Sequence, residues 1–409
     1  MAVFSSSIVF INRPEVELLV RAELKNLGVG KIEVAKSAEQ CIPLIIKDTT
    51  ALLIMSWDVG TNSACQVLEA IQNPIRVAMH PVFLISSKEV DGMSGLALEY
   101  GVSYLHVGDV TADVVKKALK HIEKHEELGK EMKDSLALAS DARSKGDLAS
   151  ASQVLKELFE KHPDQERVGL EYCENLFMQE NLEDATKILE KYVQTESPNP
   201  RALNLYGRTL MKAGKVKEAA SALQKADFTN PFNVDRLLQL GDAYLHLQKY
   251  DKAKTAFDKA VKIYPDKEDA KKGLCKSMLV GGELNEALSF MKQLSGPREM
   301  ASVFNGSAIL SMVHNHYAEG MKLYGVALDT IGGDPELASK LAFNMGIGFH
   351  RQKDNKSAAV CFRIASKMDS GNAKASEYVQ SLKSVVEVDE GPLPDDHAEL
   401  IAILKNMLP

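Results

Sequence analysis

The feature that most constrains the fold of this 409-residue chain is an internal repeat in its second half. Gly207 and Gly241 lie 34 residues apart, and Ala219 and Ala253 are separated by the same interval. Large apolar residues accompany these small residues at helical spacing. A constant period of this length is typical of stacked helical units, each of which buries its apolar face only against its neighbours. The sequence therefore predicts a helical solenoid and not a single globular core.

The clearest unit combines Gly241, Tyr244, Ala253, Phe257 and Pro265. Small residues allow two helices to approach closely where they cross, and the aromatic residues fill the space between units. This arrangement resembles the tetratricopeptide repeat (TPR), whose period is 34 residues. The resemblance implies an all-α TPR superhelical solenoid over residues 134–386. About seven units are expected, with starts near residues 132, 166, 200, 234, 268, 301 and 339.

The first part of the chain has a different pattern, in which short apolar runs end in polar residues. These runs lie at residues 8–13, 51–58, 81–87 and 101–108. They resemble the first, third, fourth and fifth strands of a bacterial response-regulator receiver, each with its following turn. The resemblance implies a flavodoxin-like α/β receiver domain over residues 1–125.

The residues that carry out phosphoryl transfer in receivers are replaced in this sequence. The resemblance implies an acidic pair that holds Mg²⁺ after the first strand, a phosphoryl-accepting aspartate at the end of the third, and a lysine at the end of the fifth. Those positions hold Asn12 and Arg13, Ser56, and Val107. These side chains supply neither the carboxylates that bind Mg²⁺ nor the nucleophile of an aspartyl phosphate. The sequence therefore predicts a pseudo-receiver that keeps the fold as a binding surface.

Three further positions belong to the same degenerate site. Asp58 lies two residues beyond the lost acceptor, where the receiver family contributes mainly a backbone carbonyl, and this argues against a substitute role. Ser86 and Tyr104 fill the hydroxyl and aromatic switch positions of the family. Both residues suit a packing role equally well, so the sequence leaves their function open.

The composition is that of an ordinary globular protein, with 45% apolar and 26% charged residues. The net charge of −7 argues against a nucleic-acid partner. No apolar run approaches the ~18 residues of a membrane span, and the N-terminus lacks the basic region of a secretory signal. Five dispersed cysteines form no C-x-x-C pair, and no enzyme motif is present. We therefore expect a cytoplasmic protein without a metal, a cofactor or catalytic residues.

Two segments are expected to flank the repeats. Residues 126–133 predict a helical joint, because no glycine or proline interrupts residues 110–128. Residues 372–386 predict a helix that caps the last unit. Its apolar face combines Ala375, Tyr378, Leu382 and Val385.

Residues 387–409 predict an acidic, flexible tether followed by a short amphipathic helix. This helix packs either on its own array, which is the interpretation we favour, or on another protein as a docking peptide. A tether of this length spans up to ~40 Å when extended. In the first case we expect it to lie near Lys272 and Lys276 and to regulate access to the array.

In the TPR family the first helix of each unit lines the concave surface and contacts ligands. The resemblance assigns this role to residues at helical spacing in the third, fourth and fifth units. They are Arg201, Asn204, Arg208, Lys212, Asp235, Leu238, Asp242, His246, Lys272 and Lys276. Each of them also suits a solvated surface position. As a set they predict a partly basic groove for a protein or peptide partner.

Two classes of function remain. The favoured one is a non-enzymatic adaptor, in which the pseudo-receiver face and the TPR groove each bind a protein or peptide in a bacterial signalling or motility complex. The alternative is a phosphorylation-controlled two-component response regulator with a TPR output domain. Asn12, Arg13, Ser56 and Val107 oppose the alternative. The sequence identifies no partner, and it leaves a homodimer open.

Overall fold

The computed structural model describes residues 4–71, 80–124, 130–330, 334–383, 385 and 391–408. The chain forms two compact units, Met1–Ala243 and Tyr244–Pro409. Residues 126–129 of the predicted joint lie outside the described residues, and residues 130–133 form the start of a helix.

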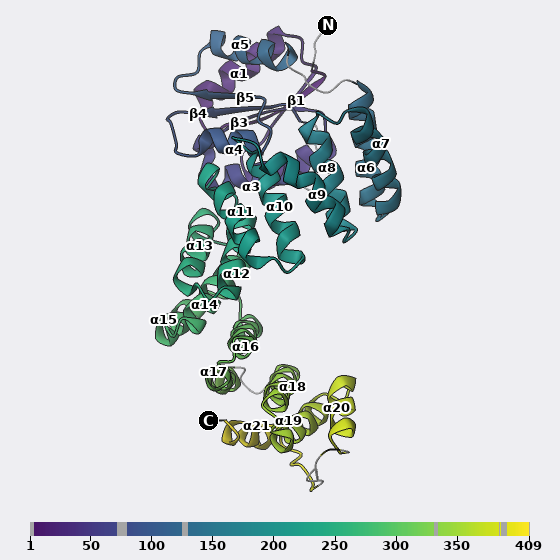
Figure 1. Ribbon diagram of the computed structural model, residues 1–409. Helices are drawn as coiled ribbons and strands as arrows, with labels where there is room; N and C mark the ends of the chain where they lie inside the picture. Colours follow the sequence, from purple (N-terminus) through teal and green to yellow (C-terminus); the bar gives the residue numbers. More distant parts are fainter. Residues whose placement is uncertain are drawn as a thin grey trace. The chain divides into compact units, whose positions relative to one another are not determined.

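A five-stranded parallel sheet forms the beginning of the first unit (Figure 1). Its strands are β1 Ser6–Phe10, β2 Lys31–Val34, β3 Leu52–Ser56, β4 Val82–Ser86 and β5 Tyr104–Val107. They lie in the order β2-β1-β3-β4-β5. This order is consistent with the flavodoxin-like fold, in which ligands bind beyond the carboxyl ends of the strands.

Helices cover both faces of this sheet. They are α1 Pro14–Asn26, α2 Ala38–Lys47, the 3₁₀ helix η1 Trp57–Val59, α3 Thr61–Ile71, α4 Met93–Glu99 and α5 Ala112–Lys124. Figure 1 shows α1 and α5 on one face, and α3 and α4 on the other. The central strands β3 and β4 are buried along their whole length, as their continuous apolar sequences require. We refer to residues 6–124 as the α/β module.

Paired antiparallel helices make up the remainder of the chain. In order they are α6 Lys130–Ser144, α7 Leu148–Lys161, α8 Glu166–Met178, α9 Leu182–Val193, α10 Pro200–Lys212, α11 Val216–Thr229 and α12 Val234–His246. The second unit continues with α13 Tyr250–Ile263, α14 Glu268–Val280, α15 Leu284–Met291, α16 Pro297–Val313, α17 Tyr317–Thr330, α18 Pro335–Arg351 and α19 Asn355–Met368. This is a TPR-like solenoid, as the repeat pattern predicted.

Left-handed residues mark the register of the repeats. Each first helix of a pair is followed, two residues after its end, by a residue with positive φ. These residues are Gly146, Glu180, Gly214, Gln248, Gly282, Asn315 and Lys353. Their spacing is 34 residues as far as Gly282 and then becomes 33 and 38. The left-handed residue ends each first helix and turns the chain into the second one.

The starts expected for the last two units were four residues late. The first helices of these units begin at Pro297 and Pro335 instead of near residues 301 and 339. Proline is favoured at the first helical position for two reasons. Its fixed φ suits the helix, and an N–H at that position would have no partner within the helix. Both helices contain 17 residues and are longer than the other first helices.

Small residues have the expected role at helix crossings. A β-carbon at Gly207 would lie 2.6 Å from the side chain of Leu223 in the second helix of the same unit. A β-carbon at Gly346 would lie 2.7 Å from the ring of Phe362. Any larger residue would push these helices apart, and overpacking of this kind usually costs ~1–3 kcal/mol.

The capping helix is α20 Ala373–Lys383, close to the predicted range. Ala375 and Leu382 are buried in it, and the ring of Tyr378 stacks on that of Phe362 at 4.7 Å. The expectation for Val385 was wrong, since this side chain is 66% exposed. The helix ends two residues earlier, so Val385 does not continue its apolar face.

The C-terminal helix α21 His397–Asn406 packs on its own repeats, as favoured from the sequence. It contacts α17, α18 and α19, and Leu400 and Leu404 are fully buried there. The expected position of the tether near Lys272 and Lys276 was wrong. Its described part lies along α19, where Asp395 pairs with Lys367 at 2.7 Å.

Among the described residues, no helix has the length and apolar character that a bilayer crossing demands.

The tail is therefore expected to stabilise the second unit. Leu404→Ala should lower the free energy of unfolding of this unit by ~2–5 kcal/mol, because it removes a fully buried side chain. Thermal or urea unfolding of the full chain, followed by circular dichroism, measures the loss. Asn406→Ala, at an exposed position of the same helix, is the control. Equal stability of the two variants would contradict a structural role for α21.

Candidate functional site

The residues predicted to form a degenerate receiver site lie near the ends of β1, β3, β4 and β5. Among them, the half-buried Asp58 carboxylate is bound by several protein groups. The carboxylate oxygens accept hydrogen bonds from the Ser87 backbone N–H at 3.2 Å, the Ser87 hydroxyl at 2.7 Å and the Ser56 hydroxyl at 3.1 Å. The guanidinium of Arg13 lies 3.4 Å away. Asp58 thus already has a counter-charge and three donors.

Asn12 completes this corner by donating a hydrogen bond to the backbone carbonyl of Asp58. An amide and a guanidinium therefore occupy the place beside the carboxylate. In the described part of the chain, no group of three or more His, Cys, Asp and Glu side chains is arranged to hold a metal ion. Mg²⁺ in proteins is held by one or two carboxylates together with phosphate and water oxygens, and an adjacent cation opposes its binding.

The other three predicted residues lie apart from this hydrogen-bonded group. Ser86 is fully buried, and its hydroxyl donates to the carbonyl of Lys88 at 2.6 Å. Tyr104 packs edge-on against Phe83 and His121, with ring centroids 5.5 and 5.3 Å away. Val107 pairs with Ser86 across the sheet and is 41% exposed. The contacts of Ser86 and Tyr104 are those of residues that hold the local fold.

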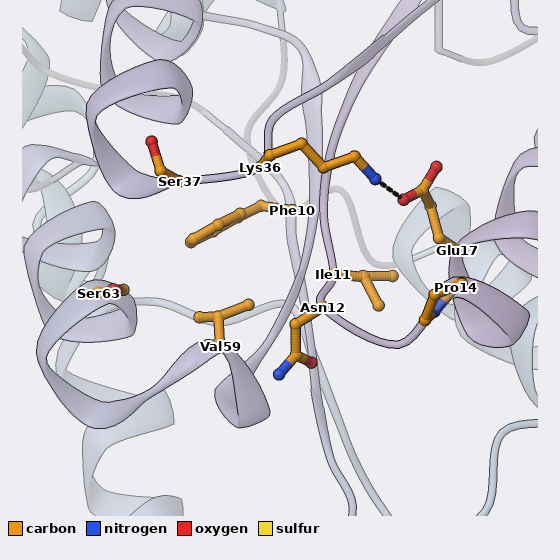
Figure 2. Close-up of a pocket in the computed structure, with 9 residues that line it drawn as sticks. All are labelled: Phe10, Ile11, Asn12, Pro14, Glu17, Lys36, Ser37, Val59 and Ser63. Carbon is orange, nitrogen blue, oxygen red and sulfur yellow. Dashed lines mark hydrogen bonds and ion pairs between the residues drawn. The ribbon is translucent and has the colours of Figure 1, made fainter.

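A hollow of about 330 Å³ adjoins the same strand ends (Figure 2). The lining residues are Phe10, Ile11, Asn12, Pro14, Glu17, Lys36, Ser37, Val59 and Ser63. Lys36 forms an ion pair with Glu17, and this hydrogen bond lowers the pKa of the Glu17 carboxyl. The hydroxyl of Ser37 caps α2 by accepting from the Gln40 backbone. The polar groups of this hollow therefore serve the module itself, and they form no pair of nucleophile and base.

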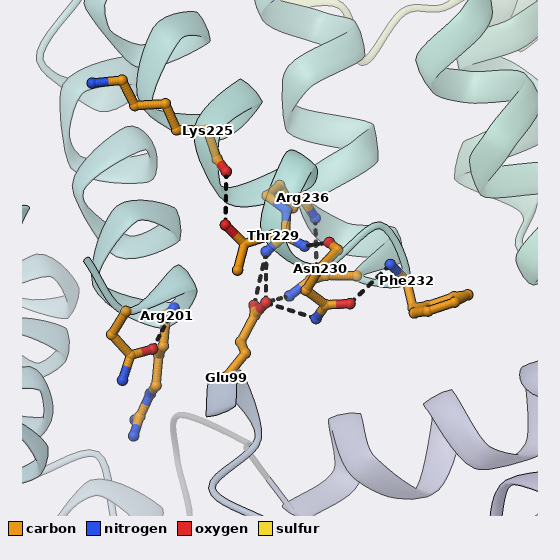
Figure 3. A network of polar contacts seen from close by, with 9 residues as sticks. Glu99, Arg201, Lys225, Thr229, Asn230, Phe232 and Arg236 are labelled. Atoms are coloured by element: carbon orange, nitrogen blue, oxygen red, sulfur yellow. Dashed lines mark hydrogen bonds and ion pairs between the residues drawn. The ribbon is translucent and has the colours of Figure 1, made fainter. Parts of the chain in front are cut away.

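The second candidate site is the contact between α4 and the repeats (Figure 3). Glu99, at the end of α4, is only 2% exposed. Its carboxylate accepts from the side-chain amides of Asn230 and Asn233, each at 2.7 Å. Both of its oxygens lie 2.9 Å from Nη1 of Arg236, which is fully buried in α12.

The repeats hold these donors in place. The side-chain oxygen of Asn230 accepts from the Phe232 backbone at 3.0 Å, and that of Asn233 accepts from the Arg236 backbone at 2.8 Å. Each amide therefore has its N–H₂ group turned toward Glu99. The loop between α11 and α12 thus forms a carboxylate-binding site that Glu99 occupies.

Close approach of α4 depends on two glycines. A β-carbon at Gly95 would lie 1.9 Å from the carbonyl oxygen of Thr229, and one at Gly92 would lie 2.4 Å from the ring of Pro231. Beside them, Trp57 packs edge-on against Phe232 with ring centroids 5.0 Å apart. A buried ion pair, two tight glycine contacts and an aromatic pair together join the α/β module to the repeats within the first unit.

Three cations of the predicted groove, all on α10, form ion pairs with carboxylates of α8 and of the turn that follows it. Arg201 pairs with Glu171 at 2.6 Å, Arg208 with Glu174 at 3.0 Å, and Lys212 with Glu180 at 2.9 Å. Arg208 and Lys212 also lie over the ring of Phe177. These cations were predicted to line a partner-binding groove or to be solvated, but the side chains of Arg201 and Arg208 are only 22% and 24% exposed.

The remaining groove residues differ in exposure. Asn204 is half-buried on α10, and Leu238 is half-buried on α12. Asp235, Asp242 and His246 are exposed on α12. Lys272 and Lys276 are half-buried on α14, in the second unit. Sequence reasoning missed Glu99, Asn230, Asn233 and Arg236, although Gly92 and Gly95 in a short helix signalled a close contact.

Comparison with known proteins supports the repeat fold. A family model for the tetratricopeptide repeat matches residues 142–209, and a model for anaphase-promoting complex, cyclosome, subunit 3 matches residues 178–260. No curated protein matches the chain. Both family matches lie within the paired helices. The chain therefore contains a TPR array, a class of module that generally serves protein–protein interaction.

Several solved structures are similar at low identity. The crystal structure of MamA is 24% identical over 38% of this chain and 91% of that one, with a TM-score of 0.36. A tetratricopeptide repeat protein from Parabacteroides merdae ATCC 43184 is 20% identical over 62% of this chain and 100% of that one, with a TM-score of 0.44. The Cut9–Hcn1 hetero-tetramer of the APC/C is 13% identical over 66% of this chain and 52% of that one, with a TM-score of 0.39.

Glu99→Gln should loosen the module from the repeats. The change keeps the shape of the side chain but leaves Arg236 buried without its counter-charge, and breaking such a pair typically costs ~3–5 kcal/mol. Emission of Trp57, the single tryptophan, should shift to longer wavelength as its contact with Phe232 opens. Glu89→Gln, at an exposed position of the same module, is the matched control. Identical emission from both variants would show that Glu99 does not hold the contact.

Glu171→Gln should change the response of the first unit to acid. Burial would raise the pKa of Glu171, but the guanidinium groups of Arg201 and Arg143 outweigh it and lower this pKa to about 2. The stabilisation is therefore complete above the ordinary value of 4.5 and is lost as the pH falls toward 2. The difference in free energy of unfolding between wild type and variant should shrink across that interval. Exposed Glu157→Gln should show no such trend.

Proposed function

We propose that this chain is a non-enzymatic adaptor of bacterial signalling or motility complexes, built from a pseudo-receiver and a TPR array. The observation that carries the proposal is the closed strand-end corner, in which Arg13, Ser56 and Ser87 engage Asp58. A receiver that transfers phosphoryl groups needs that corner open and acidic. Here it is filled and contains a cation.

The α4 contact supports the same proposal. On this proposal the module has no residues for phosphoryl transfer, but the buried Glu99 carboxylate still attaches it to the repeats. Such a module acts by binding other proteins at its surface. Its remaining faces and the array then present two binding surfaces on one chain. The partners are other proteins or peptides, and the net charge of −7 disfavours nucleic acid.

The alternative function is a phosphorylation-controlled response regulator with a TPR output. It requires Asp58 to leave three donors and Arg13, and to bind Mg²⁺ without a second carboxylate. The positive charge of Arg13 opposes Mg²⁺ binding beside it, and it stabilises the existing ion pair with Asp58. The adaptor is therefore the better-supported function.

Treatment of the full chain with beryllofluoride or acetyl phosphate and Mg²⁺ tests the choice. We expect unchanged amide chemical shifts around the corner and no change in Trp57 emission. As a positive control, Arg13→Asp combined with Ser56→Asp returns carboxylates to the lost positions and should make Trp57 emission respond to Mg²⁺. Saturable quenching of the unmodified chain at low millimolar Mg²⁺ would favour the response regulator instead.

A further inference from the structure

The carboxylate-binding site that Glu99 occupies is built by the repeats alone (Figure 3). We call it the docking loop and define it as residues 230–236, which run from the end of α11 into the first turn of α12. The side-chain oxygens of Asn230 and Asn233 accept from backbone N–H groups of the same loop. The Asn230 carbonyl accepts from the Arg236 guanidinium. Since none of these contacts involves the α/β module, we expect the docking loop to keep its shape when Glu99 leaves.

The helix α4 fits the docking loop in both shape and charge. Gly92 and Gly95 permit a close approach that a β-carbon at either position would prevent. One turn after Gly95, the Glu99 carboxylate meets the two amides and the guanidinium of the loop. The loop therefore recognises a glycine, a second glycine three residues later and a glutamate four residues after that.

The contact that holds α4 in place is narrow and largely polar. Among the described elements of the α/β module, only α4 packs extensively on a helix of the repeats, which is α10. Nε of Arg236 is buried there without a hydrogen-bond partner among the described residues. Opening returns this group and both charges of the ion pair to water, which offsets much of the lost attraction. Small polar interfaces between domains permit relative motion, so α4 can leave the docking loop without unfolding of the module or the repeats.

The docking loop also contacts a second segment of the module. Trp57 of η1 packs edge-on against Phe232 of the loop, although η1 and α4 are separate in sequence. A peptide that carries only the two glycines and the glutamate lacks this part of the contact. The loop thus fits a folded module surface, and a second copy of this chain carries that whole surface.

We propose that the docking loop binds α4 of a second copy of this chain in place of its own. Reciprocal exchange remakes every contact of the closed form between two chains, and exchange of an identical element is a low-cost route to a dimer. The attached module competes with this exchange, because a covalently linked ligand acts at an effective concentration around millimolar. The closed monomer therefore prevails at micromolar concentration, and the exchanged dimer forms where copies are concentrated or the closed contact is weakened.

Two complementary variants of the full chain test the proposal. Asn230→Asp/Asn233→Asp keeps the side-chain oxygens that accept from the loop backbone, but it places carboxylates beside Glu99 and so releases α4. Glu99→Lys leaves the docking loop intact and repels its own α4 from Arg236. Each variant alone should be monomeric at micromolar concentration, because one lacks a working loop and the other lacks the ligand.

A mixture of the two variants should form a one-to-one dimer, measured by sedimentation velocity. A fluorescently labelled Asn230→Asp/Asn233→Asp chain should bind Glu99→Lys about tenfold more tightly than it binds the unmodified chain, whose docking loop is occupied. Circular dichroism establishes that each variant is folded. Asn233→Asp alone replaces the double variant if the latter does not fold, since it keeps the hydrogen bond to the Arg236 backbone.

The matched control is Glu89→Lys, which makes the same change of charge at an exposed position of the module and leaves the ligand in place. Its mixture with Asn230→Asp/Asn233→Asp should remain monomeric. A mixture of the complementary variants that also remains monomeric would overturn the proposal. A dimer that forms equally with Glu89→Lys would overturn it too, because the chains would then associate through another surface.

Discussion

The ion pair between Glu99 and Arg236 determines how the first unit is assembled. It joins residues 137 positions apart, and both side chains are almost completely buried. Removing two charges from water costs several kcal/mol per ion, and their attraction offsets this only when the remaining polar atoms are also matched. Asn230 and Asn233 provide that match for the Glu99 oxygens, and the Asn230 carbonyl accepts from the Arg236 guanidinium, whose Nε alone is left without a partner among the described residues. A displacement of α4 by one turn would bury both charges without partners. The main effect of the pair is therefore to fix the position of α4 against the repeats, and its net contribution to stability is smaller.

Charge is used differently in the two units. The first unit keeps its charges inside, through Arg143, Glu171 and Arg201 and through the pairs that follow them along α8 and α10. These contacts hold neighbouring repeats together. In the second unit, apolar packing dominates the core, and α21 completes it. Arg298 and Glu336, for example, form an ion pair in this unit with both side chains more than half exposed.

Much of the fold followed from periodicity, whereas the functional contacts did not. The 34-residue period predicted four first helices at their observed starting residues, 166, 200, 234 and 268. The predicted starts of the last two first helices were four residues late, because these helices begin at Pro297 and Pro335 and the spacing changes there. The absence of carboxylates at Asn12 and Ser56, at the ends of β1 and β3, was also visible in the sequence. The sequence did not show that Arg201 is largely buried or that Glu99 pairs with Arg236. Both contacts depend on which elements meet in three dimensions. A charged residue has the same sequence signature on a solvated face and in a buried pair.

The long separation between Glu99 and its partners also affects how the chain is made. Synthesis proceeds from the N-terminus at ~5–20 residues per second, and domains generally fold as they emerge. The α/β module is complete at Lys124, but Asn230, Asn233 and Arg236 are added more than 100 residues later. For roughly 5 to 25 seconds a nascent module therefore shows Trp57, the glycines of α4 and the Glu99 carboxylate to its surroundings. During that interval a ribosome-bound chain exposes the docking surface that the finished protein conceals.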